Sequence, residues 1–300
     1  MQIFRDLIPT TENTAVALGY FDGVHLGHQN VLAQAIECKK QGLTPAVFTF
    51  SRTPKKGDGL LQLLTVEQRT ARLEQLGIEI LYIIDFQQVK ELSPEEFVEK
   101  ILKKVFNAKK VFCGFNYHFG KNGVGNSETL QNLCENQNIE TYVADPVIVD
   151  TNIISSTLIR KLLKKGDIEK ANKYLGYDFG YYSTAVKGNR IGTKLGTPTI
   201  NQNISDDMIT PKFGVYASKV TIDGKTYTGV SNVGIKPTIS GNNAPLCETW
   251  LPEYSGGDLY GKTVDTRLKV FIRGEKKFSD LEELKSAIES DGKTAINILK

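Results

Sequence analysis

The chain has 300 residues, of which 40% are hydrophobic and 24% are charged, as is usual for a soluble protein with ordinary cores. Its 37 basic and 34 acidic residues leave a net charge of +3, too small to indicate a nucleic-acid partner. No apolar stretch approaches the length of a membrane span, and the first residues lack a signal-peptide pattern, so we expect neither a membrane protein nor a secreted one.

The four cysteines are far apart and form no CxxC pair. Neither a zinc site nor a disulfide framework is therefore indicated, and a reducing cytoplasm is the simplest compartment. The length of the chain favours two compact domains over one. The sequence carries no signal for an oligomeric state. The cysteines are Cys38, Cys113, Cys134 and Cys247.

The first predicted element is a strand over the apolar run Thr14–Leu18, and a helix is predicted from Leu26 to about Lys40. Between them lies the sequence GYFDGVHLGH, which contains two of the three histidines of the chain. Gly19 and Gly23 permit a tight turn from strand to helix and let a ligand approach the backbone closely.

His25 and His28 are three residues apart, so their imidazoles lie on one face where the helix begins. The start of a helix adds free N–H groups and positive dipole character at the same place. This combination suits the α-phosphate of a triphosphate, which gains charge as a nucleophile attacks. The alternative is that these are ordinary turn glycines and surface histidines.

Further strands and helices alternate up to about Gly176. Thr65 with Gln68 predicts a capping-box start to a helix that ends at Gly77, and Ser93 predicts a second such start. Alternating strands and helices predict a parallel sheet with helices on both faces, whose site lies beyond the carboxyl ends of the strands. The remaining strands of this half are predicted at Ala46–Phe50, Glu79–Phe86, Lys109–Gly114 and Ile139–Ala144.

From about Gly180 short β-prone runs are separated by Gly, Asn and Asp. Asp223-Gly224 between two of these runs is a hairpin signal. We therefore predict a small antiparallel β-barrel with one helix from Ser279 to about Ser290. The domain boundary is predicted near Tyr177–Gly180. The predicted strands are Tyr181–Val186, Val215–Ile222, Lys225–Val233 and Thr263–Phe271.

Several of these segments resemble known motifs. The GxFDGxHxGH pattern resembles the HxGH signature of nucleotidylyltransferases, in the form found in bacterial FAD synthetases. Asn116–Lys121 (NYHFGK) resembles the (D/N)FxFGK segment of that family, and Ile154–Arg160 (ISSTLIR) matches its ISSTxIR motif. Gly196–Asn201 (GTPTIN) carries the PTxN motif of riboflavin kinases. Glu248, Leu259–Gly261 and Ile272–Phe278 follow in the kinase order.

The resemblance covers nearly the whole chain and is to the bifunctional riboflavin kinases/FMN adenylyltransferases. It implies an N-terminal Rossmann-like adenylyltransferase domain over residues 1–178, and a β-barrel riboflavin kinase domain over residues 181–300. The implied activities are phosphorylation of riboflavin to FMN with ATP, and adenylylation of FMN to FAD with release of pyrophosphate. The implied partners are these small molecules and Mg²⁺.

In the first domain the resemblance assigns His25 and His28 to the ATP phosphates. Arg160, four residues after Ser156, would clamp the β- and γ-phosphates. Asp22 is a candidate either to orient a histidine or to bind the turn backbone, and by analogy it is no metal ligand. The hydroxyls of Ser155, Ser156 and Thr157 lie where a helix begins, and they either cap it or bind phosphate. The other candidates for ATP binding are Gly19, Phe21, Gly23, Asn116, Ser155 and Thr157.

In the second domain Thr199 and Asn201 are the candidates to hold Mg²⁺ and phosphates, since Mg²⁺ prefers a few hard oxygen ligands. Glu248 is the candidate general base for the ribityl 5′-hydroxyl, with a solvated strand carboxylate as the alternative. Trp250 either flanks the flavin or belongs to the barrel core. The other candidates are Gly192, Lys194 and Gly196 for phosphate, and Tyr260 and Arg273 for flavin.

The chain also departs from the family pattern. After Phe48-Thr49-Phe50 the family commonly continues toward Pro-His-Pro, whereas this chain has Ser51-Arg52-Thr53-Pro54. His118 stands where the family usually has another polar residue. Two alternatives to the bifunctional enzyme follow: an enzyme that retains only one activity, or a flavin-binding regulatory protein descended from the enzyme. Retention of both histidines and of the kinase candidates argues against the regulatory protein.

Overall fold

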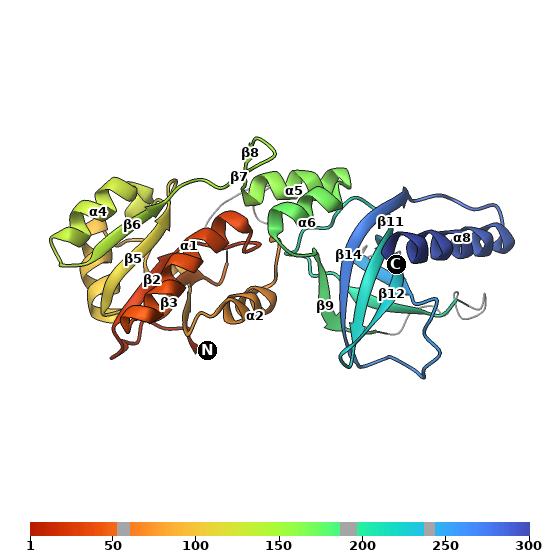
Figure 1. Cartoon of the computed structure of the whole chain (residues 1–300), viewed down its shortest axis with the longest axis horizontal. Coiled ribbons are helices and arrows are strands. Elements are labelled where there is room, and N and C mark those ends of the chain that lie inside the picture. The colour runs from red at the N-terminus through yellow and green to blue at the C-terminus, as the bar shows by residue number, and fades with distance from the viewer. Residues whose placement is uncertain (53–60, 187–196, 237–243) are drawn as a thin grey trace. The chain divides into compact units, whose positions relative to one another are not determined.

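The computed structural model describes residues 1–52, 61–186, 197–236 and 244–300. Its contacts divide the chain into two compact units, residues 1–156 and residues 157–300. The first unit runs from red to yellow-green in Figure 1, and the second from green to blue. Within the described ranges, no helix is both long enough and apolar enough to cross a membrane.

The N-terminal unit is built on a six-stranded parallel sheet with the strand order β1-β4-β3-β2-β5-β6. Strands β2 and β4 are buried at every residue, because they lie inside a sheet covered on both faces. The predicted parallel sheet is therefore confirmed. The strands are β1 (Gln2–Phe4), β2 (Thr14–Leu18), β3 (Thr44–Phe50), β4 (Ile80–Ile84), β5 (Ala108–Gly114) and β6 (Glu140–Ala144).

The helices of this unit follow the strands along the chain. α1 (Leu26–Glu37) packs on β2, β3 and β5, and α4 (Ser127–Glu135) packs on β6. The predicted capping box at Thr65 is present at the start of α2 (Val66–Leu76), and Gly77 ends that helix with a left-handed backbone. The shorter elements are η1 (Cys38–Gln41), η3 (Phe86–Gln88), α3 (Pro94–Glu96), η5 (Lys121–Gly123), β7 (Ile148–Val149) and β8 (Asn152–Ile153).

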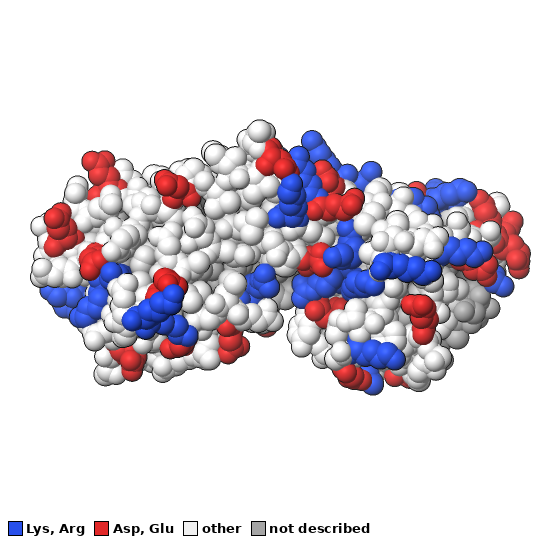
Figure 2. Space-filling view, viewed as in Figure 1, with Lys and Arg blue, Asp and Glu red and all other residues white. Residues whose placement is uncertain are grey.

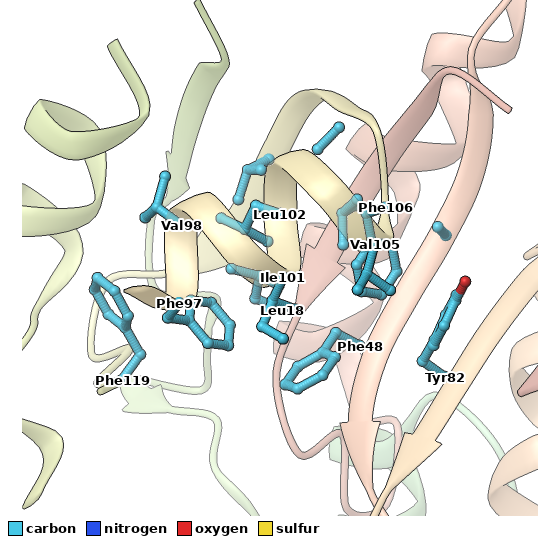
Figure 3. Packing of buried hydrophobic residues seen from close by; sticks show 14 of the residues in the cluster. Leu18, Phe48, Tyr82, Phe97, Val98, Ile101, Leu102, Val105, Phe106 and Phe119 are labelled. Atoms are coloured by element: carbon cyan, nitrogen blue, oxygen red, sulfur yellow. The ribbon is translucent and has the colours of Figure 1, made fainter. Parts of the chain in front are cut away.

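After the predicted capping box at Ser93, the chain continues as a π-helix, η4 (Phe97–Val105). The amide of Phe106 accordingly donates to the carbonyl of Ile101, five residues earlier. The apolar side chains of η4 pack on one face of the sheet, as Figure 3 shows for the residues around Leu18 and Phe48. This cluster is the main core of the N-terminal unit.

The C-terminal unit is a six-stranded antiparallel sheet with the order β10-β13-β12-β11-β14-β9. A bridge between Val186 and Asn201 brings the first and last strands of this order together, so the sheet nearly closes into the predicted barrel. The strands are β9 (Gly180–Thr184), β10 (Thr199–Asn203), β11 (Gly214–Ile222), β12 (Lys225–Lys236), β13 (Ala244–Trp250) and β14 (Thr263–Gly274).

The predicted hairpin at Asp223-Gly224 joins β11 to β12, with Ile222 paired to Lys225. Both turn residues have a positive φ, 50° at Asp223 and 79° at Gly224. This backbone matches the twist of the two strands, which is why Asp-Gly is favoured there.

The C-terminal helix α8 (Leu281–Leu299) packs on β11, β12 and β14. It is longer than predicted, because the expected stop near Ser290 does not occur at Asp291-Gly292. Asp291 accepts hydrogen bonds from Arg273 of β14 instead of leaving the helix. Gly292 lies against Trp250, where an added Cβ would be 2.5 Å from the indole ring. The glycine therefore permits a close approach rather than ending the helix.

Two short helices, α5 (Ser156–Lys165) and α6 (Ile168–Leu175), precede the barrel. α6 packs on β14, and Asn172 joins the two: its Nδ2 donates to the carbonyl of Leu268 at 2.8 Å, and its Oδ1 accepts from the amide of Phe179 at 2.8 Å. Phe179 is fully buried. The helix α6 is thus bound tightly to the barrel.

Figure 2 shows acidic and basic side chains interspersed on the face in view. This mixture agrees with the nearly balanced composition of 37 basic and 34 acidic residues.

Candidate functional site

The turn between β2 and α1 is buried and conformationally unusual. Phe21 and Val24 both have a positive φ, 54° and 37°, as does Gly23 at 80°. A β-branched residue such as Val24 rarely adopts this backbone, so the turn is strained and the surrounding packing holds it in place. Gly19 faces the ring of Phe21, where an added Cβ would be 3.0 Å from Cζ. The turn therefore needs glycine at the positions that the sequence singled out.

The structure brings the two histidines of this turn together. His25 is the N-cap of α1, and its Nδ1 accepts a hydrogen bond from the amide of His28 at 3.3 Å. The two imidazole rings stack with centroids 3.6 Å apart and planes 15° apart. An added Cβ at Gly27 would lie 3.2 Å from the ring of His25, so this glycine leaves room for the imidazole.

The surroundings of His28 favour its neutral form. Burial, then the neighbouring His25, then Arg69 lower the pKa of His28 well below its ordinary value of 6.5. Its Nδ1 atom is buried and has no hydrogen-bond partner in the described part of the chain. A buried polar atom without a partner is rare and points to a ligand or a water at this place.

The carboxylate and the carbonyl of Asp22 both fix neighbouring chain segments. Asp22 Oδ1 accepts a hydrogen bond from the amide of Leu63 at 2.8 Å, and its carbonyl accepts one from the hydroxyl of Ser156 at 2.9 Å. The first contact is with the segment before α2. Ser156 thus ties the ISST segment to the turn.

The other candidates of the ISST motif lie around the start of α5. Ser155 is half-buried, and Thr157 is exposed. Arg160 is half-buried on α5, one helical turn after Ser156. Arg160 belongs to the second compact unit, residues 157–300.

The NYHFGK segment follows the carboxyl end of β5. Asn116 and His118 are exposed there, whereas Phe119 is buried. The ring of Phe119 packs against Phe97 with centroids 5.3 Å apart, within the core cluster. Phe119 is therefore a core residue.

One buried residue beside the turn was missed by the sequence reasoning. Arg69 of α2 is 1% exposed and donates hydrogen bonds to the carbonyls of Tyr20 and Phe50. The available signal was its spacing from Leu73, which puts the two on one helix face. A charged residue on a helix is usually solvated, so the pattern alone gave little reason to select it.

In the C-terminal unit the kinase candidates meet on neighbouring strands. Asn201 of β10 pairs directly with Glu248 of β13, which pairs on its other side with Asn232 of β12. Directly opposed residues project from the same face of a sheet, so these side chains form one row. Thr199 lies two residues before Asn201 and shares its face.

The chemistry of this row suits a hard cation. Asn201 is 2% exposed, and its Oδ1 atom is buried with no hydrogen-bond partner among the residues that the structure describes. An oxygen without a partner on the same sheet face as Thr199 fits Mg²⁺, which binds a few such oxygens together with phosphates and water. No group of three or more His, Cys, Asp or Glu in the described ranges could hold a metal by itself.

The flavin candidates lie in different surroundings. Trp250 packs with Val215, Val230 and Ala295, between the sheet and α8. Arg273 forms hydrogen bonds through Nε and a terminal nitrogen to Asp291, at 3.1 Å and 2.7 Å. Tyr260 is half-buried, and its amide donates to Asp258. Gly192, Lys194, Gly196 and the Ser51–Pro54 departure beyond Arg52 lie outside the described residues.

Comparisons with known proteins identify similar proteins for both halves of the chain. The FAD synthetase family matches residues 7–158, and the riboflavin kinase family matches residues 175–299. A bifunctional riboflavin kinase/FMN adenylyltransferase of Listeria monocytogenes is 34% identical over 94% of this chain and 91% of its own length. The protein of that name from Bacillus subtilis is 35% identical over 94% of this chain and 92% of its own.

A solved structure has the same fold over nearly the whole chain. It is described as a macrolide-efflux protein from Streptococcus pneumoniae, and it covers 98% of both chains with a TM-score of 0.88 at 31% identity. The FAD synthetase match covers the part of the chain that forms the parallel sheet, and the riboflavin kinase match covers the part that forms the barrel. With both curated relatives matching almost end to end, the chain belongs to the family of bifunctional riboflavin kinases/FMN adenylyltransferases.

Proposed function

We propose that the turn at residues 19–28 transfers the adenylyl group of ATP to FMN, and that the row on β10 and β13 phosphorylates riboflavin. The observation that carries the first assignment is the pair of stacked imidazoles at the N-terminus of α1. Free backbone N–H groups and the helix dipole favour a phosphate at the same place.

Adenylyl transfer requires alignment and stabilisation of charge. An oxygen of the FMN phosphate attacks the α-phosphorus of ATP, the bond to the bridging oxygen of the β-phosphate breaks, and pyrophosphate leaves. His25 and His28 donate hydrogen bonds to the α-phosphoryl oxygens, where charge increases in the transition state. With its pKa lowered by burial, His28 is neutral near pH 7 and donates from one nitrogen.

The remaining ATP contacts of the first reaction rest on the motifs. Arg160 is the candidate to clamp the β- and γ-phosphates, because its planar fork matches phosphate oxygens. Ser155 and Thr157 offer hydroxyls near the same helix start. Asn116 follows the end of a sheet strand, where its amide is a candidate to read adenine, ribose or the FMN phosphate.

In the kinase reaction Glu248 is the general base. It takes the proton from the ribityl 5′-hydroxyl of riboflavin as that oxygen attacks the γ-phosphorus of ATP and ADP leaves. Thr199 and Asn201 would hold Mg²⁺, which neutralises phosphate charge when it is bound. The register that pairs Asn201 with Glu248 supports this assignment, since it brings the base next to the phosphate side.

We also infer that the chain works in a reducing compartment, the cytoplasm. All four cysteines are free and buried, namely Cys38, Cys113, Cys134 and Cys247. A secreted protein would be expected to use cysteines in disulfides.

The direct test is to incubate the purified chain with riboflavin, ATP and Mg²⁺ and to resolve the flavins by chromatography. FMN should appear first and FAD afterwards, with release of ADP and pyrophosphate. FMN without FAD, or FAD only from added FMN, would leave a single activity. Tight riboflavin binding without any turnover would favour the regulatory protein.

A further inference from the structure

Arg69 is a buried cation next to the adenylyl-transfer turn. It lies on α2, and its side chain is 1% exposed. Removing a guanidinium from water is costly unless its hydrogen bonds are replaced, so a buried arginine needs a compensating structural or chemical reason. An apolar residue would fill the same space at less cost.

The guanidinium joins two chain segments that meet at the carboxyl end of the sheet. One terminal nitrogen donates to the carbonyl of Tyr20 at 2.7 Å, and the other donates to the carbonyl of Phe50 at 2.6 Å. Tyr20 lies in the turn after β2, and Phe50 is the last residue of β3. The planar fork of arginine can reach both carbonyls at once, whereas a lysine ammonium has no such fixed pair of donors.

Neighbouring contacts strengthen the same junction. The carbonyl of Tyr20 also accepts a hydrogen bond from the hydroxyl of Thr49 at 2.9 Å. The guanidinium carbon lies 4.6 Å from the centroid of the Tyr20 ring, within reach of a cation–π interaction. The position of the turn relative to β3 is thus fixed by several contacts that converge on one residue.

We propose that Arg69 is a positioning residue for adenylyl transfer: its guanidinium holds the phosphate-binding turn against the end of β3 and places a fixed positive charge at this turn. This inference rests on the proposed function of the turn. It adds a role for a residue that is buried and acts through Tyr20 and His28.

The charged groups that act on His28 come from two elements. His25 comes from the same turn and Arg69 from α2, and both lower the pKa of His28 in addition to burial. Burial lowers the pKa of Arg69, and Tyr20, Asp22 and Glu67 oppose this effect because each favours the charged form of the guanidinium. Since arginine remains charged at every physiological pH, its influence on His28 is constant.

Two substitutions separate the charge of Arg69 from its geometry. Arg69→Lys keeps the charge but loses the fork, so the turn is held at one carbonyl instead of two. Arg69→Met keeps much of the apolar stem and loses both. Arg5→Met removes an arginine from an exposed position of the same unit and serves as the matched control.

The measurements are the pH profile of FAD formation from FMN and the NMR titration of ¹³C-labelled histidine in the full chain. With three histidines in the chain, His28→Asn and His118→Gln variants assign the signals. Urea unfolding of each variant serves as the check that the N-terminal unit, which contains Arg69, is folded.

We expect Arg69→Lys to lower the rate of FAD formation by about 10²-fold, the cost of a small misplacement, without moving the pH profile. Arg69→Met should lower the rate at least as far, raise the pKa of His28 and move the acid limb of the profile to higher pH. Arg5→Met should match the parent in all three measurements.

The role of Arg69 is refuted if the methionine variant keeps the parental rate and the parental histidine titration. An equal loss of rate in both variants with an unmoved His28 titration would make Arg69 a structural staple only, which also overturns the proposal. The titration needs no turnover. If the parent makes no FAD, the proposed function fails. The titration still tests whether Arg69 lowers the pKa of His28.

Discussion

The imidazole rings of His25 and His28 stack with centroids only 3.6 Å apart. Two positive charges at this separation repel each other strongly, so the pair resists double protonation. Burial adds to the effect, and the pKa of His28 falls well below its ordinary value of 6.5. The turn is therefore built to keep at least one neutral imidazole when acid would charge an exposed histidine.

This relationship predicts how stability depends on pH. The unfolded chain binds a proton at His28 near pH 6.5, whereas the folded chain binds it only at lower pH. Between the two values the unfolded state holds more protons, so the free energy of unfolding falls as the pH falls through this window. Above pH 6.5 the contribution of His28 to stability is fully present.

Urea unfolding of the full chain at about pH 8 and about pH 5.5 measures this effect. The parent should lose more stability on acidification than His28→Asn, in which the titrating group is absent. His118→Asn, which changes an exposed histidine, should follow the parent. Equal losses in the parent and in His28→Asn would contradict the prediction.

His28→Ala should abolish most FAD formation and leave FMN formation near the parental rate. Loss of one preorganised donor to a phosphoryl oxygen typically costs about 2.7–4 kcal/mol of transition-state stabilisation. Assays with FMN and with riboflavin as the starting flavin separate the two activities, and His118→Ala is the control. A similar fall in both activities would show that the site is misplaced or that the variant is misfolded.

Glu248→Gln should slow FMN formation by about 10²–10⁴-fold, because the side chain keeps its shape but no longer takes a proton. The KM for ATP should change little, since Thr199 and Asn201 are intact. FAD formation from added FMN should be unaffected. Glu253→Gln, at an exposed position after the same strand, is the control.

Thr199→Ala separates the two kinase roles. It should weaken the use of Mg·ATP, seen as a raised requirement for Mg²⁺. A Glu248→Gln protein with unimpaired kinase turnover would make Glu248 a solvated strand carboxylate.

The two activities should reside in separable fragments, and the fragment ends matter. Residues 157–300 should phosphorylate riboflavin and make no FAD, because this unit has its own sheet and core. Residues 181–300 should be less stable by about 3 kcal/mol or more, since that fragment lacks the fully buried Phe179 and its hydrogen bond to Asn172. Urea unfolding of both fragments measures the difference.

Equal stability of the two fragments would support the boundary near Tyr177–Gly180 that the change in sequence pattern predicts. A fragment 157–300 that folds and makes no FMN would refute the kinase assignment.

Asp291→Ala should destabilise the C-terminal unit by about 1.5–3 kcal/mol, because it removes a charged hydrogen-bond partner and leaves Arg273 without it. Thermal unfolding of residues 157–300 measures the loss. Glu289→Ala changes an exposed carboxylate on the same helix and should have little effect. A loss of equal size in both variants would mean that the contribution comes from the helix and not from the pair.

Local signals predicted much of the fold. The strand Thr14–Leu18, the helix start at Leu26 and the capping box at Thr65 lie where the sequence places them. The Asp223-Gly224 hairpin does too. Each depends on neighbouring residues alone, which is why a single sequence carries the information.

Features that depend on distant partners were not predicted. Asp291-Gly292 reads as a helix end, but contacts with Arg273 and Trp250 carry the helix on to Leu299. The π-helix at Phe97–Val105, whose apolar side chains pack into the core cluster, was not predicted from its capping residues either.

In the candidate site, too, local features were predicted and features that depend on distant residues were not. The histidine pair was recognised because a glycine-rich turn and a helix start are local patterns. Arg69 was missed because its partners Tyr20 and Phe50 are 49 and 19 residues away in the sequence. Burial of a charge is decided by such long-range contacts, and no periodicity reveals it.

The two sheets differ in when they can form. The hairpin of β11 and β12 pairs residues that adjoin one another in the chain, from Ile222 and Lys225 outward, so its contacts can close within microseconds. In the parallel sheet Gln2 pairs with Ile80, and each such contact requires closure of a long loop first. During synthesis β1 leaves the ribosome before β4 does, so it must wait for β4 before it can pair in this sheet.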